Sequence, residues 1–374
     1  MIEHHFGESE PLSLGVEEEI MILDAETLMP AASVETLVNG SDPLDLPGRL
    51  KTELHASVVE LNTKVCRDGE EAFSALRALR GAASDIAAEG GLVIAAAGAH
   101  PLAHAEDLII VPEPRYLAFV EYAGISAIRQ GVNGLHVHVG MPGPEESLHV
   151  LDGILPWLPL VLALSANSPY SGGEETGMAS YRAEILGLLP RRGAPPALAS
   201  YREWEELMER LVATGLVSDY TAIWWDVRIH PSFGTIEIRS PDQPTSVELT
   251  AAFVALFQAL CAHALAEPRR PRELGFRVVY DQNRWAASRF GPRATFIHPD
   301  TGQAVELPEL AAELLERIRP YARELGTEHL LEAIPLNRCE GDLLLEVGRR
   351  DGLLAACRDF TERTVDFQSS VSSD

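Results

Sequence analysis

The sequence predicts an α+β fold in which one side of a β-sheet is the active surface. Three segments either alternate with a period of two or are rich in β-favouring residues, and two of them place acidic side chains on the strand. Long segments with apolar residues at every third or fourth position separate these strands and predict helices. Strands that lie between long helices and carry carboxylates indicate an α+β domain with its chemistry on the sheet face.

The expected elements follow one another without a repeat of fixed period. Strands are expected at Leu14–Asp24, Leu135–Gly140 and Gly234–Arg239. Helices are expected at Glu70–Glu89, Tyr201–Thr214, Ser246–Ala266, Leu307–Leu325 and Leu343–Val365. The third of these helices opens with the cap-like Thr245 and Ser246 and carries Glu248 in its first turn. Nothing in the sequence demands a second domain.

Composition excludes several classes of function. The chain has 374 residues, 46% of them hydrophobic, which is enough for a large core. Its net charge of -26 argues against duplex nucleic acid or an anionic membrane as the main partner, because binding to either needs clustered Lys and Arg. A nucleotide stays possible, since bound divalent cations can reverse the field of an acidic cleft.

The sequence also indicates where the protein works. The apolar stretches Ile154–Ala166 and Leu249–Ala266 are interrupted by prolines or by polar residues, so we do not expect either to span a membrane. The first residues, Met1–Pro11, lack the basic segment and the apolar run of a signal peptide. We therefore expect a cytoplasmic protein.

The first strand presents two carboxylates together. Alternation sends Glu17 and Glu19 to one face, and Val16, Glu18 and Ile20 to the other. Two buried carboxylates this close are unfavourable unless a cation neutralises them. The alternative is a solvated edge strand with three acidic residues.

A second acidic pair, Glu53 and Glu60, lies in an otherwise mostly apolar stretch. Glu60 stands among Val58, Val59 and Leu61, where a surface acid is not expected. A spacing of seven residues is also what a helix with one polar face would show, so the pair by itself is a weak signal of a ligand site.

The segment Leu135–Gly140 places two histidines, His136 and His138, on one face of a strand. A His-x-His strand often binds metal. Imidazole suits Zn, Mn, Fe or Ni, whereas Mg²⁺ prefers carboxylate and water. The alternative is one core histidine with a backbone partner and one exposed histidine.

On the last expected strand, Glu237 and Arg239 share a face with Thr235. This strand offers a metal-type ligand beside a guanidinium, which can grip phosphate or carboxylate oxygens and stabilise charge during phosphoryl transfer. An internal ion pair between neighbouring strands is the alternative.

Three further arginines stand beside aromatic residues or asparagine: Arg182, Arg228 and Arg284. Such arginines bind phosphate or carboxylate groups, or else stack on rings and cap helices. The chain has no Walker A sequence, no dinucleotide-binding glycine motif, no nucleophile elbow and no His-Glu-x-x-His helix.

The order of the four strand clusters resembles the glutamate-cysteine ligase type 2 family, and more narrowly its YbdK-like bacterial carboxylate-amine ligases. The segments Gly98–Pro101, Ser165–Pro169 and Trp225–Asp242 add to the likeness, which covers the chain from Leu14 to beyond Arg289. Asn133 and Ala99 depart from the cysteine and threonine that we expect at these positions in the family, so the second substrate stays open.

The resemblance implies a glutamine-synthetase-like fold: a mostly antiparallel sheet with helices packed on one face and the active site on the other. It implies a single catalytic domain over residues 1–374, with a core at about 12–295 and a helical C-terminal part at 296–374. It also implies ATP, Mg²⁺ or Mn²⁺, small-molecule substrates and a homodimer or a higher homo-oligomer.

The resemblance assigns roles to individual residues. Glu237 and Arg239 are expected to be catalytic, and Arg239 and His136 to bind the nucleotide. Arg182 and Arg284 are expected to bind it as well, on the ground of their sequence neighbours and not of the resemblance. The expected metal ligands are Glu17, Glu19, Glu53, Glu60, His138 and Glu237.

The activity expected from the family is ATP-dependent ligation of a carboxylate to an amine through an acyl-phosphate, with glutamate plus cysteine or another amine as substrates. The main alternative is a metal-dependent amide or ester hydrolase that uses His136 and His138. A phosphotransferase and a nucleotide-binding protein without turnover are the remaining alternatives.

Overall fold

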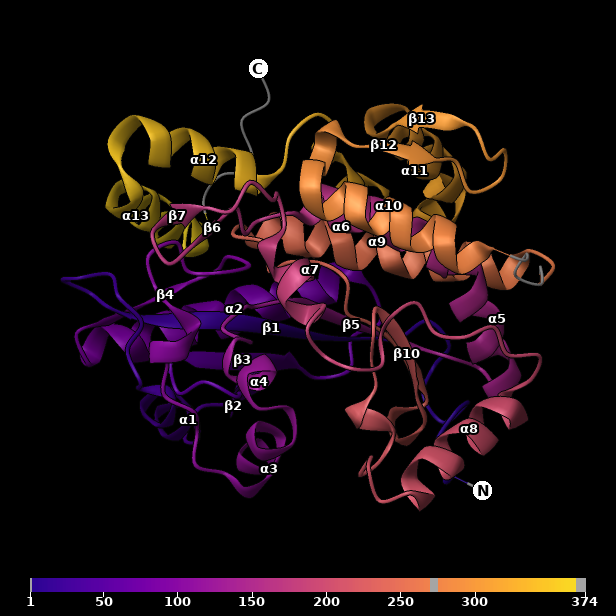
Figure 1. The fold of residues 1–374 in the computed structure, drawn as a ribbon, viewed down its shortest axis with the longest axis horizontal. Coiled ribbons are helices and arrows are strands. Elements are labelled where there is room, and N and C mark those ends of the chain that lie inside the picture. The colour runs from indigo at the N-terminus through magenta and orange to yellow at the C-terminus, as the bar shows by residue number, and fades with distance from the viewer. Residues whose placement is uncertain (1, 270–274, 368–374) are drawn as a thin grey trace.

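A computed structural model describes residues 2–269 and 275–367. In these residues a seven-stranded sheet has the order β10-β11-β5-β1-β3-β2, with β4 paired to the far half of β1 (Figure 1). Every pairing in this sheet is antiparallel. The strands are β1 (Leu14–Asp24), β2 (Gly48–Thr52), β3 (Val58–Thr63), β4 (Leu92–Ala95), β5 (Leu135–Gly140), β10 (Val227–His230) and β11 (Thr235–Ile238).

The apolar side of the sheet is covered by helices. Val16, Val137 and Ile236 are fully or almost fully buried on this side. Two long helices pack there, α2 (Gly69–Glu89) and α9 (Val247–Ala266), and they also contact each other. The side chain of Ser246 accepts a hydrogen bond from the backbone N–H of Leu249, so the expected N-cap of α9 is confirmed. The opposite side of the sheet is left for polar side chains.

One acidic residue of β1 faces the helices. The carboxylate of Glu18 lies 2.5 Å from Nη2 and 2.9 Å from Nε of Arg80 in α2, and both side chains are fully buried. Gln243 and Thr250 donate further hydrogen bonds to the same carboxylate. This network joins the central strand to α2 and α9, so β1 is held from behind.

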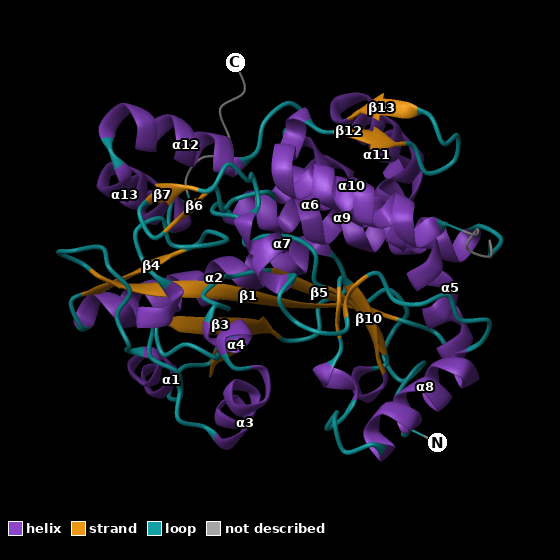
Figure 2. Ribbon diagram, in the orientation of Figure 1, coloured by secondary structure: helices purple, strands orange, loops and turns teal. Residues whose placement is uncertain are grey.

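Most of the remaining helices surround this core. Figure 1 shows α6, α9, α10 and α11 gathered on one side of the sheet, and Figure 2 shows the same layers by secondary structure. Leu310, Leu314 and Ile318 of α11 belong to the same buried cluster as α9. Apart from α2 and α9, the helices up to α11 are α1 (Val34–Ser41), α3 (Pro114–Ala123), α4 (Ile125–Ile128), α5 (Pro144–Ile154), α6 (Leu158–Ser165), α7 (Tyr181–Leu186), α8 (Tyr201–Ala213), α10 (Phe276–Phe290) and α11 (Leu307–Glu324).

Two apolar stretches are long enough to cross a membrane by length and composition, Pro144–Ser165 and Val247–Ala266. In each stretch, 78% of the most apolar 18-residue segment is buried inside the protein. Both stretches are therefore core elements of this fold, which agrees with the expectation drawn from their interrupted sequence.

The C-terminal helix is interrupted. The sequence predicts a helical segment over Leu343–Val365, but the structure has two helices, α12 (Glu340–Asp351) and α13 (Leu353–Thr364). Gly352 separates them with a φ of +90°, which a residue with a Cβ rarely adopts. The predicted helical periodicity is therefore correct for both α12 and α13, and Gly352 forms the turn between them.

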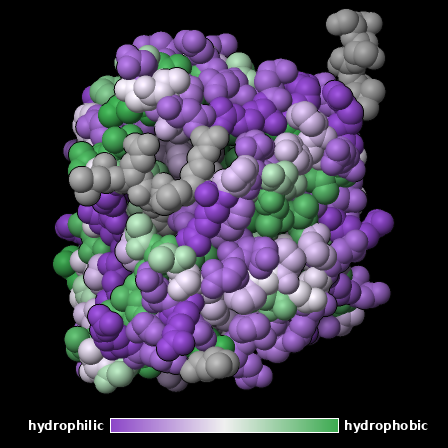
Figure 3. Space-filling view, turned by 90° about the vertical axis from the view of Figure 1, so that its right-hand side faces the viewer, coloured by the Kyte–Doolittle hydropathy of each residue, from purple (hydrophilic) through white to green (hydrophobic). Residues whose placement is uncertain are grey.

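Short strand pairs complete the structure. They are β6 (Tyr170–Ser171) with β7 (Glu174–Glu175), β8 (Arg192–Gly193) with β9 (Trp224–Trp225), and β12 (Thr295–Ile297) with β13 (Ala304–Glu306). The face in Figure 3 is mostly hydrophilic, with smaller separate hydrophobic patches, as the acidic composition leads one to expect.

Candidate active site

The pairing of β1 with its two neighbours brings acidic and imidazole side chains together. Glu17 stands opposite His136 of β5 and opposite Asn62 of β3. Two residues further along β1, Glu19 stands opposite Glu60 of β3. Because side chains of directly paired residues share a face, these five residues form one polar surface. The sequence predicts that Glu17 and Glu19 share a face, and the strand register identifies the residues of β3 and β5 beside them.

A candidate metal site lies where β1, β5 and β11 meet. Glu17, His138 and Glu237 each offer a ligand atom, and these atoms all lie within 4.8 Å of one another. Glu237 is the direct cross-strand partner of His138. Nδ1 of His138 lies 2.9 Å from Oγ1 of Thr235, which fixes the ring and leaves Nε2 on the side of Glu17, 3.7 Å from its Oε1.

This donor set fits a divalent cation. Two carboxylates and one imidazole suit Mn²⁺, and Mg²⁺ when water completes its octahedron. The amide of Asn62 adds a second sign, because its Nδ2 donates to Oε1 of Glu17 at 3.0 Å while its buried Oδ1 has no partner among the described residues. An amide oxygen is a further hard ligand for such an ion.

Glu17 is held as a carboxylate. Burial opposes its ionisation, but the neighbouring imidazoles of His136 and His138 outweigh burial and keep the pKa of Glu17 well below its usual value. Nδ1 of His136 lies 3.4 Å from Oε2 of Glu17. Burial lowers the pKa of His136 to about 4, so this imidazole is neutral near pH 7 and donates a hydrogen bond without carrying charge.

A second acidic group extends from the first. Glu19, Glu53 and Glu60 are all partly or largely enclosed, and burial raises the pKa of each. For Glu53 burial and the charge of Glu19 raise the pKa to about 7. Arg182 and Arg239 act on Glu19, and Lys51 lies 3.8 Å from Glu60, but the pKa of each carboxyl group still stays raised. A divalent cation would offset this remaining cost, although the described residues place these three carboxylates in no common ligand group.

Two arginines surround Glu237. Nε of Arg228 lies 2.5 Å from its Oε2, and Nη1 of Arg239 donates to its Oε1. Burial opposes the ionisation of Glu237, but both guanidinium groups outweigh burial and hold its pKa well below the usual value. A permanent carboxylate and two fixed positive charges therefore lie at one edge of the candidate metal site.

Arg182 reaches the same surface from α7. It donates to the backbone oxygens of Arg239 and Ser240, at 3.1 and 3.2 Å, and lies 3.9 Å from the carboxylate of Asp242. The absence of a side chain at Gly134 makes room for this guanidinium, because a Cβ on this residue would lie 2.0 Å from Nη2 of Arg182. The N–H of Gly134 also donates to Glu19 at 2.5 Å, so this glycine has a steric and a polar role.

Arg284, which its sequence neighbours predict to bind the nucleotide, is engaged elsewhere. Its guanidinium donates to the carboxylate of Asp226 at 2.8 Å and to the backbone oxygen of Ala183 at 3.3 Å. Tyr280 donates to the same carboxylate at 2.6 Å. Asp226 borders the active-site cavity and Arg284 does not, so contact between Arg284 and nucleotide stays a prediction.

A cavity of about 760 Å³ opens from this polar surface. Of the expected ligand-binding residues, Glu19, Glu53, His136, Arg182 and Arg239 line it. Part of the cavity wall is aromatic and comes from α3 and from the segment before β10. That wall contains Tyr116, Phe119, Tyr122, Trp224 and Trp225.

Sequence reasoning missed some of these contacts. Asn62 shares the alternation of Glu60, and this pattern could have placed it on the polar face. Thr235 was placed beside Glu237, but nothing in the sequence showed that it would touch His138. The sequence did not decide whether Arg228 binds a ligand or has a structural role, and in the structure it forms an ion pair with Glu237.

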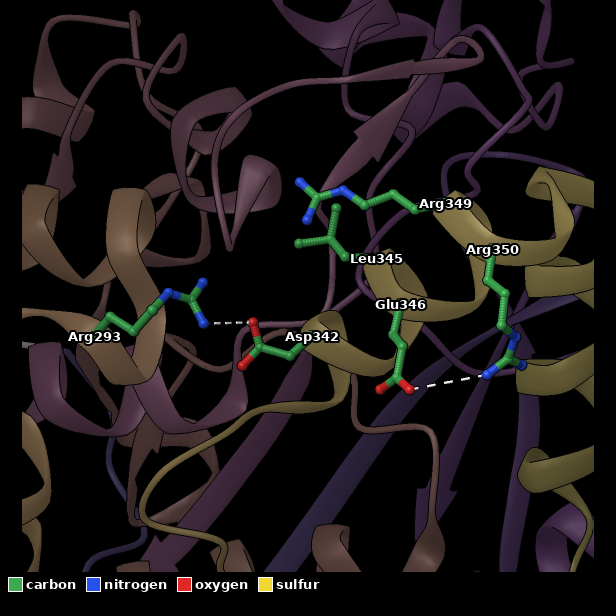
Figure 4. Close-up of a pocket in the computed structure, with 6 residues that line it drawn as sticks. All are labelled: Arg293, Asp342, Leu345, Glu346, Arg349 and Arg350. Carbon is green, nitrogen blue, oxygen red and sulfur yellow. Dashed lines mark hydrogen bonds and ion pairs between the residues drawn. The ribbon is translucent and has the colours of Figure 1, made fainter.

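A separate shallow hollow lies beside α12 (Figure 4). Its cations already have partners: Arg293 lies 2.7 Å from Asp342, Arg349 contacts Glu175, and Arg350 lies 3.8 Å from Glu346. None of the expected ligand residues is in this hollow. The cavity on the sheet is therefore the candidate active site.

Sequence comparison places the chain among known proteins. A family profile described as glutamate-cysteine ligase family 2 (GCS2) matches residues 13–344. A Rubrobacter xylanophilus protein, named as a candidate glutamate–cysteine ligase 2-3, is 40% identical over 335 residues, which cover 89% of this chain and 90% of that protein. A Nitrosospira multiformis protein, named as a candidate glutamate–cysteine ligase 2, is 34% identical over 88% of this chain and 89% of its own length.

Solved structures share the fold at low sequence identity. The glutamate–cysteine ligase of Francisella tularensis, solved in complex with AMP, superimposes with a TM-score of 0.70 at 14% identity, over 96% of this chain and 90% of that chain. A bifunctional glutathione synthetase from Pasteurella multocida gives a TM-score of 0.67 at 14% identity, over 95% of this chain and 53% of that chain. The expected α+β fold is thus confirmed.

Proposed function

Because the chain belongs to glutamate-cysteine ligase family 2, a family of ligases, we propose that it joins the carboxylate of one small molecule to the amine of another by way of an acyl-phosphate. ATP supplies the phosphoryl group, and Mg²⁺ or Mn²⁺ accompanies it. Glutamate is the first carboxylate to test, and cysteine or another amine is its partner. The observation that carries the proposal is that Glu17, His138 and Glu237 lie close together beside Arg239 on one face of the sheet.

The chemistry explains why activation is needed. A carboxylate does not condense with an amine in water, because hydroxide is a poor leaving group. Transfer of the γ-phosphoryl group of ATP to a carboxylate oxygen releases ADP and provides a better leaving group. The amine nitrogen then forms the bond to the carbonyl carbon, the bond to phosphate breaks, and the nitrogen loses a proton.

We assign the residues of the sheet face to this reaction. Glu17, His138 and Glu237 would hold one divalent cation, and Glu19, Glu53 and Glu60 are the ligands available for others. Such an ion neutralises the charge of phosphate oxygens and aligns the reacting groups when bound. Arg239 and Arg182 place fixed positive charge at the cavity wall, where they would stabilise the transferring phosphoryl group.

His136 has a different part in this scheme. It lines the cavity and contacts Glu17, so it would orient that ligand and border the nucleotide. The hydrolase alternative needs both imidazoles on one ion, but only His138 belongs to the three-ligand group found among the described residues. The ligase is therefore the better-supported function.

Broader properties complete the proposal. We expect a cytoplasmic enzyme that acts on small molecules and forms a homodimer or a higher homo-oligomer. The net charge of -26 supports the absence of nucleic-acid partners.

The test is an activity panel. The purified protein is incubated with ATP and Mg²⁺ against amino acids, singly and in pairs, while free phosphate and product mass are followed. A ligase releases phosphate only when an acid and an amine are both present, and its product is lighter than their sum by one water. Metal-dependent cleavage of an amide or ester without ATP consumption would contradict the proposal.

A further inference from the structure

Among the described residues, one arginine beside the aromatic wall of the cavity has no acidic partner. Four arginines line the cavity within the described chain: Arg115, Arg182, Arg191 and Arg239. The first lies 3.0 Å from Glu113, the second 3.9 Å from Asp242, and the last contacts Glu237. Arg191 has no carboxylate within 4.0 Å among the described residues, although the chain carries 56 acidic residues against 30 basic ones.

The guanidinium of Arg191 is nevertheless held in place. Nε donates to the backbone oxygen of Ala222 at 3.1 Å, and Nη1 donates to the hydroxyl of Tyr122 at 3.0 Å. The group lies 5.0 Å from the ring centre of Trp224 and 5.6 Å from that of Tyr122. These contacts leave both hydrogens of Nη2 and one of Nη1 available, so a fixed positive group keeps open donors.

The backbone adds an independent sign. Arg191 has a φ of +55°, in the left-handed region that residues with a side chain rarely adopt. Unfavourable backbone conformations of this kind persist where surrounding contacts hold them, and they gather at ligand sites. Arg191 directly precedes β8, and its backbone oxygen accepts a hydrogen bond from the N–H of Trp224 in β9 at 3.0 Å, while its guanidinium contacts Tyr122 of α3.

We propose that Arg191 binds a carboxylate of an amino-acid substrate, one that does not react, and so selects amino acids over simple acids or amines. A guanidinium with two adjacent open donors matches a carboxylate in shape and charge. Most candidate metal ligands lie on strands of the sheet, whereas Arg191 contacts Tyr122 of α3 and Trp224 of β9. A bound molecule would therefore have its reacting group at the sheet and its spare carboxylate at Arg191. This inference rests on the proposed function.

The test compares substrates that differ only in that carboxylate. Glutamate is compared with 4-aminobutyrate, and cysteine with cysteamine, in the wild type, Arg191→Gln and Arg191→Lys. Arg192→Gln is the matched control, because Arg192 is the next residue in the chain, begins β8 and is exposed. We expect Arg191→Gln to raise the KM of one amino acid by about 10- to 100-fold with little change in kcat, as for a lost hydrogen bond to a charged group.

The decarboxylated partner of that amino acid should show no such change, and lysine should restore part of the affinity. The pair that responds tells whether the carboxylate belongs to the acid or to the amine. Equal losses for both members of each pair, a change confined to the KM of ATP, or no change would overturn the inference while leaving ligation intact.

If the wild type forms no product, the proposed function fails, but the inference is still measurable. Calorimetric titration of the protein with glutamate and with cysteine then reports binding directly. Weaker binding in Arg191→Gln than in Arg192→Gln supports the role of Arg191, and equal affinity in both variants contradicts it.

Discussion

At the scale of single residues, His138 is oriented from behind by Thr235. The hydroxyl of Thr235 lies 2.9 Å from Nδ1, so the ring presents Nε2 to the carboxylates of Glu17 and Glu237. Outer partners of this kind change metal affinity about 10- to 100-fold when they are removed. We therefore expect Thr235→Val to weaken Mn²⁺ binding by about that factor, measured by electron paramagnetic resonance of free Mn²⁺.

Thr214→Val is the control for this prediction. Thr214 is exposed at the end of α8, so its loss should leave Mn²⁺ affinity unchanged. Equal Mn²⁺ affinity in Thr235→Val and the wild type would contradict the assignment of His138 as a metal ligand.

Asn62 orients a second ligand of the same group. Its amide donates to Glu17 at 3.0 Å and its Oδ1 stays without a partner. Asn62→Ala should weaken Mg²⁺ binding, because Glu17 loses its orientation and the ion loses a possible oxygen. Calorimetric titration measures this, with the exposed Asn39→Ala of α1 as control. Wild-type Mg²⁺ affinity in Asn62→Ala would show that this amide has only a structural role.

The sequence could predict which residues face the site but not which residues meet. Alternation alone placed Glu17 with Glu19 and His136 with His138, because side-chain direction has a period of two. The meeting of Glu17 with Glu237 depends on β5 lying between β1 and β11, and on its register. The partner of Arg284 could not be predicted either, because Asp226 is 58 residues away in the chain.

At the scale of elements, β1 is fixed by a buried ion pair on its helix-covered side. Glu18 and Arg80 are both fully buried, and removal of one partner leaves a buried charge unpaired. Glu18→Gln should therefore lower the free energy of unfolding by about 3–5 kcal/mol, measured by urea denaturation. The double variant Glu18→Leu with Arg80→Met should recover most of this loss, because neither charge then stays in the core.

An exposed pair at the start of the same helix is the control. Arg67 lies 3.0 Å from Glu71 at the surface, and Glu71→Gln should change stability little, because solvent screens such a pair. If Glu18→Gln were as mild as Glu71→Gln, the buried pair would not be what holds β1 to α2.

The long elements could be predicted closely from the sequence. β1 and β5 have the expected bounds, and α2, α8, α9 and α11 differ from the expected bounds by one residue at an end. The strands β2, β3 and β4 were not expected, because VVELNT and LVIA do not alternate between apolar and polar residues as β5 does, and GRLKT holds a single apolar residue. The break at Gly352 was missed because the pattern on both sides of it is helical.

At the scale of the whole molecule, buried histidines oppose stability in acid. Burial lowers the pKa of His100 from 6.5 to about 4, although a hydrogen bond to Leu28 acts in the other direction. The unfolded chain therefore takes up a proton between these values while the folded protein does not. Stability is full above about pH 6.5 and is lost as the pH falls towards 4, by at most about 3 kcal/mol for this residue.

His100→Asn isolates this contribution. Nδ1 of His100 accepts from the N–H groups of Leu102 and Ala103, and an asparagine oxygen can do the same without titrating. Unfolding free energies measured by urea denaturation between pH 4 and 7 should fall less steeply in the variant, by up to one proton in slope. The same slope in both proteins would show that His100 takes up its proton equally in the folded and unfolded states.

Oxygen transfer tests the proposed reaction of the whole molecule most directly. The acid identified by the activity panel is labelled with ¹⁸O in its carboxylate and incubated with ATP, Mg²⁺ and the amine, and the released phosphate is examined by mass spectrometry. An acyl-phosphate requires that one labelled oxygen pass from the carboxylate to phosphate. Phosphate free of ¹⁸O, with product formed, would show that the carboxylate is never phosphorylated and would contradict the ligase mechanism.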